Sequence, residues 1–299
     1  TTPVRKEVLE EMIPYFTGKY GNPSSYYILG TEAKEALELA RGRVAKALNA
    51  ESDEIFFTSG GSESDNLAIK GIAFANKDKG NHIITTKIEH HAVLDACKTL
   101  ENFGFKVTYL NVYKDGFINI EELKREINSN TILISIMFAN NEIGTIEPIK
   151  EIGEIARENN IIFHTDAVQA VGNVKIDVKE MNIDLLSISG HKLYAPKGVG
   201  ALYIRNGIKI QKIQDGGHQE KNRRAGTENI PGIVGLGKAM ELAYNGIDKY
   251  TQKLEFLRNY YIEEIKKNLS EVKINGSMKN RLPGNANISF ENIRGEELL

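Results

Sequence analysis

The sequence has little cysteine, little net charge and no long hydrophobic run, and each shortage excludes a class of protein. The single cysteine, Cys97, cannot form an internal disulfide, so we expect a reducing compartment and a cytoplasmic protein. A net charge of −2 gives no reason to expect nucleic acid or an anionic membrane as a partner. No run of about 18 apolar residues occurs, so no membrane-spanning helix is predicted.

Several common site motifs are also missing. The six histidines form no HExxH-type pattern, and we predict no metal site. Neither GxGxxG nor GxxxxGK[ST] occurs, which makes a nicotinamide dehydrogenase a poor interpretation. The opening residues, TTPVRKEVLEEM, contain no apolar signal region. What is present is an ordinary globular composition, 41% hydrophobic and 26% charged.

Helical and strand-like patterns alternate for most of the chain. The strand-like runs lie at 54–59, 82–86, 106–112, 131–139, 161–166 and 185–189, and the helical patterns at 31–48, 62–76, 91–103, 119–127 and 148–159. Continuous apolar strands are typical of a parallel sheet covered by helices on both faces. The alternation therefore predicts an α/β doubly wound fold, in which ligands bind at the carboxyl ends of the strands.

The pattern changes near residue 230, which suggests a second domain. The predicted pieces are a helix over 230–269, kinked near Asn245-Gly246, and short strands at 271–276 and 285–293. We expect a large cofactor-binding domain at 1–245, with an N-terminal segment that packs on a small α+β domain at 246–299. The small domain looks incomplete, because the final GEELL resembles the start of a helix.

Polar residues follow three of the predicted strands. Residues 60–62 (Gly-Gly-Ser) lead into a helix, where free N–H groups and the helix dipole suit phosphate, although a plain N-cap at Ser62 is the alternative. His90 precedes the next helix, and taken alone it is better explained as a capping or surface residue. Residues 140–142 (Asn-Asn-Glu) form either a turn or a binding loop.

Two further strand ends carry an aspartate and a lysine. Asp166 ends one strand and Lys192 follows another, 26 positions later, which leaves room for one crossover between neighbouring parallel strands. An amine, a carboxylate and an anion-binding turn around one crevice suit pyridoxal 5'-phosphate. The lysine would form the Schiff base, the aspartate would keep the ring nitrogen protonated, and the turn would hold the phosphate.

The chain resembles the cysteine desulfurases of the NifS/IscS family, within the class V aminotransferase group. The motifs that carry the resemblance are GNPSS (21–25), FTSGGSESDNLAIKG (57–71), EHHAVLDAC (89–97), ANNEIGT (139–145), HTDAVQAVG (164–172), SGHKLYAPKGVGALY (189–203) and RRAGTENI (223–230). The resemblance implies the pyridoxal phosphate-dependent transferase fold of type I, with a mostly parallel seven-stranded sheet between helices and a small α+β domain. It also implies a homodimer that removes sulfur from L-cysteine and leaves L-alanine.

The resemblance implies roles for ten residues. Lys192 holds the cofactor and is catalytic, and His90 stacks on the ring and moves protons. The remaining cofactor-binding residues are Asp166 at the ring nitrogen, Asn141 and Gln169 at the ring hydroxyl, Gly61, Ser62, Ser189 and His191 at the phosphate, and Thr227 at the phosphate of the partner subunit. A cysteine thiolate then takes the sulfur as a persulfide and passes it to an acceptor, such as an iron–sulfur scaffold protein.

The family's catalytic cysteine and its substrate-carboxylate arginine are expected beyond residue 299, so the chain looks like a fragment. Cys97 is not that cysteine, because Val93, Ala96, Cys97, Leu100 and Phe103 recur at helical spacing and predict one buried face. His218 stands where the family more often has a third glycine. The alternatives are a selenocysteine lyase or other class V enzyme, and a non-catalytic sulfur-transfer subunit.

Overall fold

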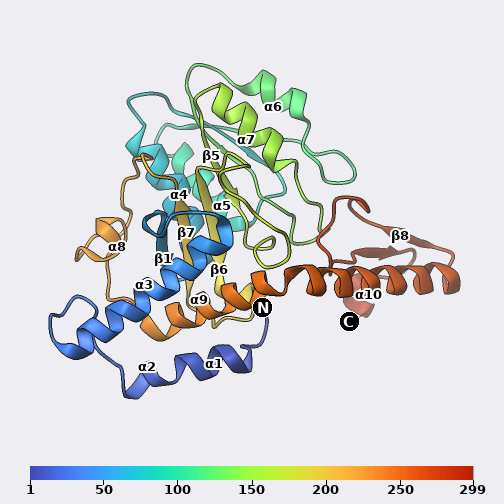
Figure 1. The fold of residues 1–299 in the computed structure, drawn as a ribbon. Helices are drawn as coiled ribbons and strands as arrows, with labels where there is room; N and C mark the ends of the chain where they lie inside the picture. The colour runs from blue at the N-terminus through green and yellow to red at the C-terminus, as the bar shows by residue number, and fades with distance from the viewer. Residues whose placement is uncertain (299) are drawn as a thin grey trace.

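A computed structural model describes residues 1–298, and its centre is one seven-stranded sheet (Figure 1). The strands are β1 (Ile55–Thr58), β2 (His82–Thr86), β3 (Lys106–Leu110), β4 (Thr131–Ser135), β5 (Ile162–Asp166), β6 (Leu185–Ser189) and β7 (Gly200–Ile204). Their order is β1-β7-β6-β5-β4-β2-β3, and only β7 runs antiparallel to its neighbours. The predicted α/β fold with a mostly parallel seven-stranded sheet is confirmed.

Helices cover both faces of the sheet. They are α1 (Lys6–Met12), α2 (Pro14–Thr17), α3 (Ile28–Leu48), α4 (Gly61–Ala75), α5 (His91–Glu101), α6 (Ile120–Glu126), α7 (Ile149–Glu158), α8 (Gln219–Asn222), α9 (Ile230–Asn245), α10 (Ile247–Asn268) and α11 (Gly295–Leu298), with short 3-10 helices at Ser52–Glu54 and Gly190–Lys192. Helices α4 and α5 pack on one face, and α3, α7 and α9 pack on the other.

The apolar strands are buried on both faces, as their continuous hydrophobic runs predict. Ile83 and Ile84 are both fully buried, yet they belong to different core clusters because successive side chains of a strand point to opposite faces. Leu185 and Leu186 in β6 divide in the same way. Two hydrophobic cores therefore hold the sheet between helices and fix where its strands end.

Two details of the sequence analysis are corrected. The strand predicted over 131–139 ends at Ser135. Beyond it, the Ile136 and Phe138 N–H groups still donate to the β5 carbonyls of His164 and Asp166, but the Met137 N–H on the other side donates to the Glu89 carboxylate instead of to a strand. Cys97 is fully buried beside Val93, as predicted, but Phe103 is 66% exposed. Phe103 lies beyond the end of α5 and meets Phe74 edge to face instead of joining the core.

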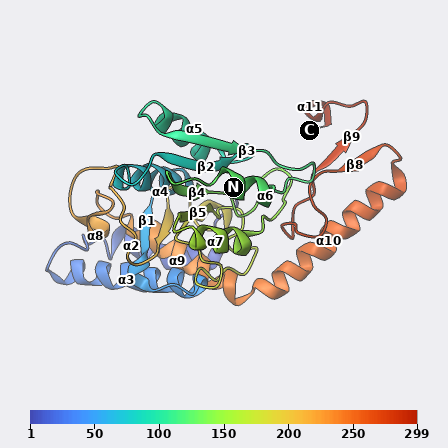
Figure 2. The ribbon, with the colours of Figure 1, turned by 90° about the horizontal axis from the view of Figure 1, so that it is seen from above.

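The helical pattern over 230–269 breaks at Gly246, close to the predicted kink. Helix α10 then extends away from the sheet, with the antiparallel strands β8 (Val272–Ile274) and β9 (Ile288–Phe290) alongside its far half (Figures 1 and 2). A division into domains at 1–245 and 246–299 is our proposal for this arrangement. The N-terminal segment lies against α9 and against the loop after β6.

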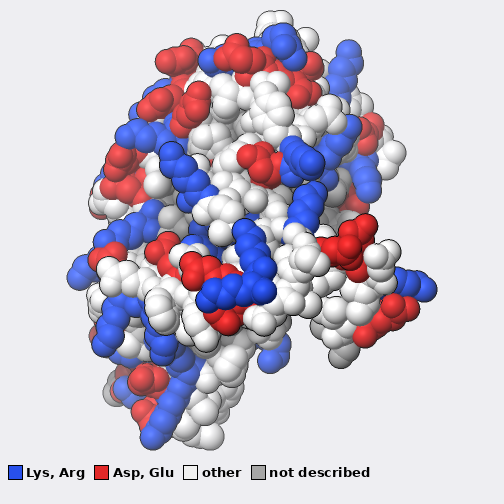
Figure 3. Space-filling model, turned by 90° about the vertical axis from the view of Figure 1, so that its right-hand side faces the viewer, with Lys and Arg blue, Asp and Glu red and all other residues white. Residues whose placement is uncertain are grey.

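The surface carries both signs of charge. On the face in Figure 3, acidic and basic side chains are interspersed, in keeping with the net charge of −2. Among residues 1–298, no helix combines the length and the apolar character needed to cross a bilayer.

Candidate active site

A cavity of about 260 Å³ lies at the carboxyl ends of the parallel strands. Its lining residues are Gly61, Ser62, Asp65, His90, Met137, Asn141, Asp166, Val168, Gln169, Ser189, His191 and Lys192. Nine of the ten residues singled out in the sequence are among them. The tenth, Thr227, is exposed and lines a separate small hollow with Ser59 and Arg224. The structure therefore brings together every predicted residue except the one expected to act on a partner subunit.

Lys192 is held at the end of a short turn that leaves β6. The 3-10 helix Gly190–Lys192 is pinned because Gly190 N–H donates to the carbonyl of Val199 at 3.0 Å. From the other side, Thr2 N–H donates to the carbonyl of His191 at 2.8 Å, and the Thr2 hydroxyl donates to the same oxygen at 3.0 Å. The main chain at Lys192 is thus fixed by the nearby Val199 and by the N-terminal segment, while its half-buried amine faces the cavity.

Asp166 is the last residue of β5 and lies on the strand next to β6. It is buried, and one carboxylate oxygen accepts the N–H of Val168 at 2.9 Å. Burial raises the pKa of Asp166, whereas the Val168 N–H and the nearby His90 and Lys192 act to lower it. A buried carboxylate with few fixed partners is suited to pair with a cationic ligand group.

An anion-binding turn closes another side of the cavity. Gly60 has a φ of 154°, which favours glycine, and Gly61 begins the 15-residue helix α4. A Cβ atom on Gly61 would lie 2.7 Å from Cγ2 of Val168, so only glycine fits without a shift. The N–H groups of Gly61 and Ser62 find no hydrogen-bond acceptor within residues 1–298. Free N–H groups at a helix start favour an anion such as phosphate.

His90 combines the two functions that the sequence left open. It is the N-cap of α5, with Nδ1 accepting the N–H of Ala92 at 3.2 Å, and its ring also lines the cavity. Behind it, Glu89 is buried and accepts hydrogen bonds from the Thr86 hydroxyl and the Met137 N–H. Burial raises the pKa of Glu89 to about 8. Helix start and cavity wall are therefore built by the same short segment.

The sequence analysis missed a buried polar group beneath the cavity. His164 lies between the hydroxyls of Ser135 (2.9 Å) and Ser187 (3.0 Å), and burial lowers its pKa to about 3, so the ring is neutral. Asp65 lines the cavity with an oxygen 3.7 Å from His164 Nε2, and burial together with Asp166 raises its pKa. Asp65 falls four residues after Gly61 on an otherwise apolar helix face, a signal that could have revealed it.

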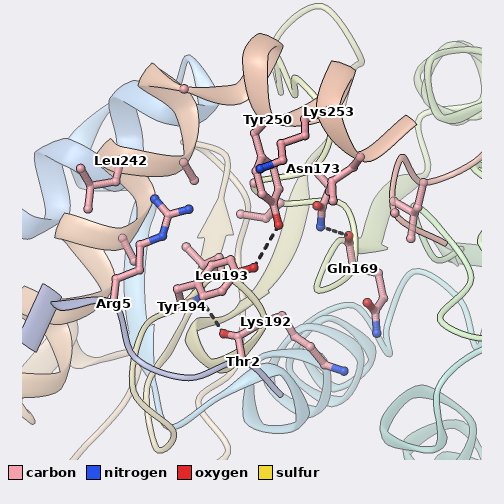
Figure 4. A pocket seen from close by; sticks show the side chains of 18 of the residues that line it. Thr2, Arg5, Gln169, Asn173, Lys192, Leu193, Tyr194, Leu242, Tyr250 and Lys253 are labelled. Atoms are coloured by element: carbon pink, nitrogen blue, oxygen red, sulfur yellow. Dashed lines mark hydrogen bonds between the residues drawn. The ribbon is translucent and has the colours of Figure 1, made fainter. Parts of the chain in front are cut away.

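A larger cavity, of about 580 Å³, shares Asn141, Gln169 and Lys192 with the first (Figure 4). Figure 4 shows Arg5 and Lys253 among its side chains, and the hydroxyls of Tyr194 and Tyr250 meet across it at 3.1 Å. No acidic side chain lines it. A ligand can thus reach Lys192 through this larger cavity, whose basic side chains attract anions. No cluster of three or more potential metal ligands occurs in residues 1–298.

Known proteins are similar to this chain in sequence and in fold. Residues 1–299 match the sequence profile of the family described as "Aminotransferase class-V". The "Cysteine desulfurase IscS" of Clostridium botulinum (strain Hall) is 63% identical over 301 residues, covering 100% of this chain and 76% of the relative. That of Methanosarcina thermophila is 62% identical over 299 residues, covering 100% and 74%.

Two solved structures are similar to the chain over nearly its whole length. A "NIFS-LIKE PROTEIN" superimposes with a TM-score of 0.97 at 42% identity, covering 100% of this chain and 82% of the other. The structure described as "SspA in complex with cysteine" has a TM-score of 0.88 at 43% identity, covering 98% and 82%.

Proposed function

This chain belongs to the cysteine desulfurases of the class-V aminotransferase family, and from that premise we propose that it removes sulfur from L-cysteine with pyridoxal 5'-phosphate as its cofactor. One observation carries the proposal. The Lys192 amine and the buried Asp166 carboxylate follow adjacent parallel strands and face one cavity, whose third side is the free N-terminus of α4. The amine, the carboxylate and the anion cradle fit the aldehyde, the ring nitrogen and the phosphate of that cofactor.

We assign the groups that hold the cofactor as follows. Gly61, Ser62, Ser189 and His191 bind the phosphate, since they lie where the helix start meets the end of β6. Asn141 and Gln169 contact the ring hydroxyl. Asp166 would hold a proton at the ring nitrogen, an attraction that its burial strengthens. Burial and the nearby Asp166 raise the pKa of Asp65, and burial lowers the pKa of His164 to about 3, so that ring is neutral. When bound, pyridoxal phosphate withdraws electrons from the α-carbon of an amino acid.

The chain's own residues then move the protons. As a free amine, Lys192 Nζ would take the α-proton of L-cysteine. His90 covers the ring and carries a proton at the exposed side of the cavity. The hydrogen bonds of Thr2 keep the turn that carries Lys192 from shifting between these steps. The products of the complete reaction are L-alanine and a persulfide.

Cys97 does not accept the sulfur. It is fully buried in the core beside α4, and burial raises the pKa of its thiol to about 12, so the reactive thiolate is absent at neutral pH. The persulfide must therefore form on a thiol other than the single cysteine of this sequence. An acceptor such as an iron–sulfur scaffold protein would take it onward.

We also propose that two chains pair. Thr227 is exposed and outside the cavity of its own chain, which suits contact with the phosphate bound by a partner subunit. Exposed aromatic and aliphatic side chains gather between α2 and the start of α3, with Phe16, Tyr20 and Ile28 each at least 60% exposed. Such a patch is typical of a protein interface. A cytoplasmic location is proposed from the low cysteine content.

The cofactor assignment is tested by visible absorption after addition of pyridoxal phosphate. The wild-type chain should acquire the band that the aldehyde develops when it condenses with a lysine amine, and Lys192→Ala should not. Lys197→Ala is the matched control, since Lys197 is exposed in the same loop and lines neither of the two cavities at the site. A band in Lys192→Ala, with circular dichroism showing both variants folded, would contradict the assignment.

The fate of the sulfur needs a second assay. The purified chain should exchange the α-proton of L-cysteine with solvent but release no appreciable sulfide, because Cys97 is out of reach. Sulfide release that is lost in Lys192→Ala and survives a thiol-blocking reagent would contradict this. The same assay on L-selenocysteine separates the proposed activity from that of a selenocysteine lyase.

A further inference from the structure

A strap of unusual backbone conformation, residues 214–229, runs beside β1 (Figure 1). Within it, Glu220 (φ 45°, ψ 46°), Lys221 (φ 54°, ψ 38°) and Asn222 (φ 64°) are three successive left-handed residues, none of them glycine. This conformation is unfavourable for residues with a Cβ atom, above all in succession. It persists where surrounding contacts hold it in place, and such places are often functional. In Figures 1 and 2, α8 flanks the edge of the sheet next to β1.

A buried ion pair anchors the strap to α3 and β1. The pair is formed by Arg41 on α3 and Glu220 in the strap, and both side chains are at most 4% exposed. Arg41 donates to the two Glu220 carboxylate oxygens at 2.8 and 2.9 Å. The same Glu220 accepts the N–H of Phe57, and Arg41 donates to the carbonyl of Ile55 at 2.6 Å. The pair thus also hydrogen-bonds the backbone of strand β1, just before the glycine turn of the cofactor cavity.

A second ion pair joins the strap to the other side of that turn. Arg224 donates to the two oxygens of Glu63 at 2.7 and 3.3 Å. Glu63 lies in the first turn of α4 and also accepts the N–H of Ser59 at 2.7 Å. Burial alone would raise the pKa of Glu63, but the hydrogen bonds from Arg224 and Ser59 outweigh it and lower the pKa, so Glu63 is ionised.

We propose that Arg224 and Glu63 are positioning residues that set the phosphate-binding turn at residues 59–62, and that the buried Arg41–Glu220 pair anchors the strap that carries Arg224. The proposal rests on the assignment of the phosphate to Gly61 and Ser62. Since Ser59 and Glu63 bracket the glycines, the direction of the free N–H groups depends on the pair.

The ligand phosphate gives a readout that a purely structural role would not move. Pyridoxal lacks the phosphate but keeps the aldehyde and the ring, so it depends on Lys192, Asp166 and the residues assigned to the ring, and not on the turn at residues 59–62. In Arg224→Gln and Glu63→Gln, the Kd for pyridoxal phosphate should rise about tenfold or more, the scale of a charge-assisted hydrogen bond. The Kd for pyridoxal should change less than about twofold, because its contacts lie outside the turn.

The matched control is Arg43→Gln. Arg43 lies on α3, pairs with Glu11 and Glu241, and is 19% exposed against 20% for Arg224, but it contacts neither strap nor turn. Its ratio of the two Kd values should equal that of the wild type. Glu220→Gln should shift the ratio in the same direction as Arg224→Gln. If Glu220→Gln does not fold, Arg224→Gln and Glu63→Gln, whose side chains are partly exposed, still test the proposal.

The possible outcomes distinguish a failure of the positioning role from a failure of the proposed function. Wild-type protein that binds neither ligand would overturn the cofactor assignment itself. Wild-type binding of both, with Arg224→Gln and Glu63→Gln leaving the ratio unchanged or weakening both ligands equally, would overturn only the positioning role. A selective loss of pyridoxal phosphate in both variants is the expected result.

Discussion

Gly61→Ala is the sharpest test of the cavity, because alanine is otherwise favourable at this position. Gly61 lies in the first turn of α4 with ordinary helical backbone, where alanine has the higher helix propensity. The new Cβ would lie 2.7 Å from Cγ2 of Val168, against about 3.5–4.0 Å for a normal carbon contact. Val168 follows Asp166 in the cavity wall, so the clash is relieved only by moving that wall.

The size of the effect follows from the overlap. Forcing a methyl group into a packed site costs about 1–3 kcal/mol, which the protein relieves by moving the cavity wall. Because pyridoxal phosphate must restore that wall to bind, its Kd should rise by about 5- to 150-fold. The double variant Gly61→Ala/Val168→Ala removes the clashing methyl and should recover most of the affinity. Gly42→Ala is the control, since the nearest atom to its Cβ would be the Ser52 hydroxyl oxygen at 3.7 Å.

The assay is a titration with pyridoxal phosphate, followed by visible absorption and checked by equilibrium dialysis. Two results would refute the reasoning. One is wild-type affinity in Gly61→Ala, which would mean that the cofactor does not approach this turn. The other is a double variant as weak as Gly61→Ala alone, which would mean that Val168 is not the obstacle.

Three further predictions concern buried acids. Asp166→Ala should leave the far-ultraviolet circular dichroism unchanged but abolish α-proton exchange on L-cysteine, and unchanged exchange would exclude the assigned role of Asp166. Glu220→Ala should destabilise the fold by about 3–5 kcal/mol, because it leaves the buried Arg41 with only the half-exposed Glu38 as a counter-charge; a melting temperature within about 2 °C of the wild type would contradict this. Glu147 accepts the N–H of Ile118, and burial raises its pKa to about 8 from 4.5, so the folded protein keeps a proton that the unfolded chain loses. Stability should therefore fall as pH rises from about 4.5 to 8, and Glu147→Gln should flatten that slope in urea titrations; an unchanged slope would show that Glu147 is ionised when folded.

The residues at the strand ends were predictable because hydrophobic periodicity, and the single crossover that joins two neighbouring strands, are properties of short stretches of sequence. Asp166 and Lys192 follow apolar runs that are long enough only for strands, and parallel strands with one crossover bring their ends together. The same argument located Gly61 and His90. Helical spacing correctly predicted that Cys97 is buried. Phe103 lies beyond the end of the helix and did not follow that spacing.

Other parts of the site depend on contacts between distant segments. Thr2 is 189 positions from His191, whose carbonyl it contacts, and no local sequence pattern predicts that contact. Asp65 was missed because a single acid on a helix face is ordinarily solvated. The apolar character of the rest of that face was the one signal in the sequence, and the packed neighbours show that Asp65 is buried.

The sequence by itself determined the α/β alternation, the order of the strands along the chain and the identity of the groups at their ends, because side-chain period and turn chemistry are local properties. The tertiary structure alone decided which charges are buried, that β7 runs antiparallel, and that the strap at 214–229 grips both sides of the glycine turn. The physical reason is that burial and ion pairing depend on which segments meet in space, and Arg41 and Glu220 meet across 179 positions of sequence.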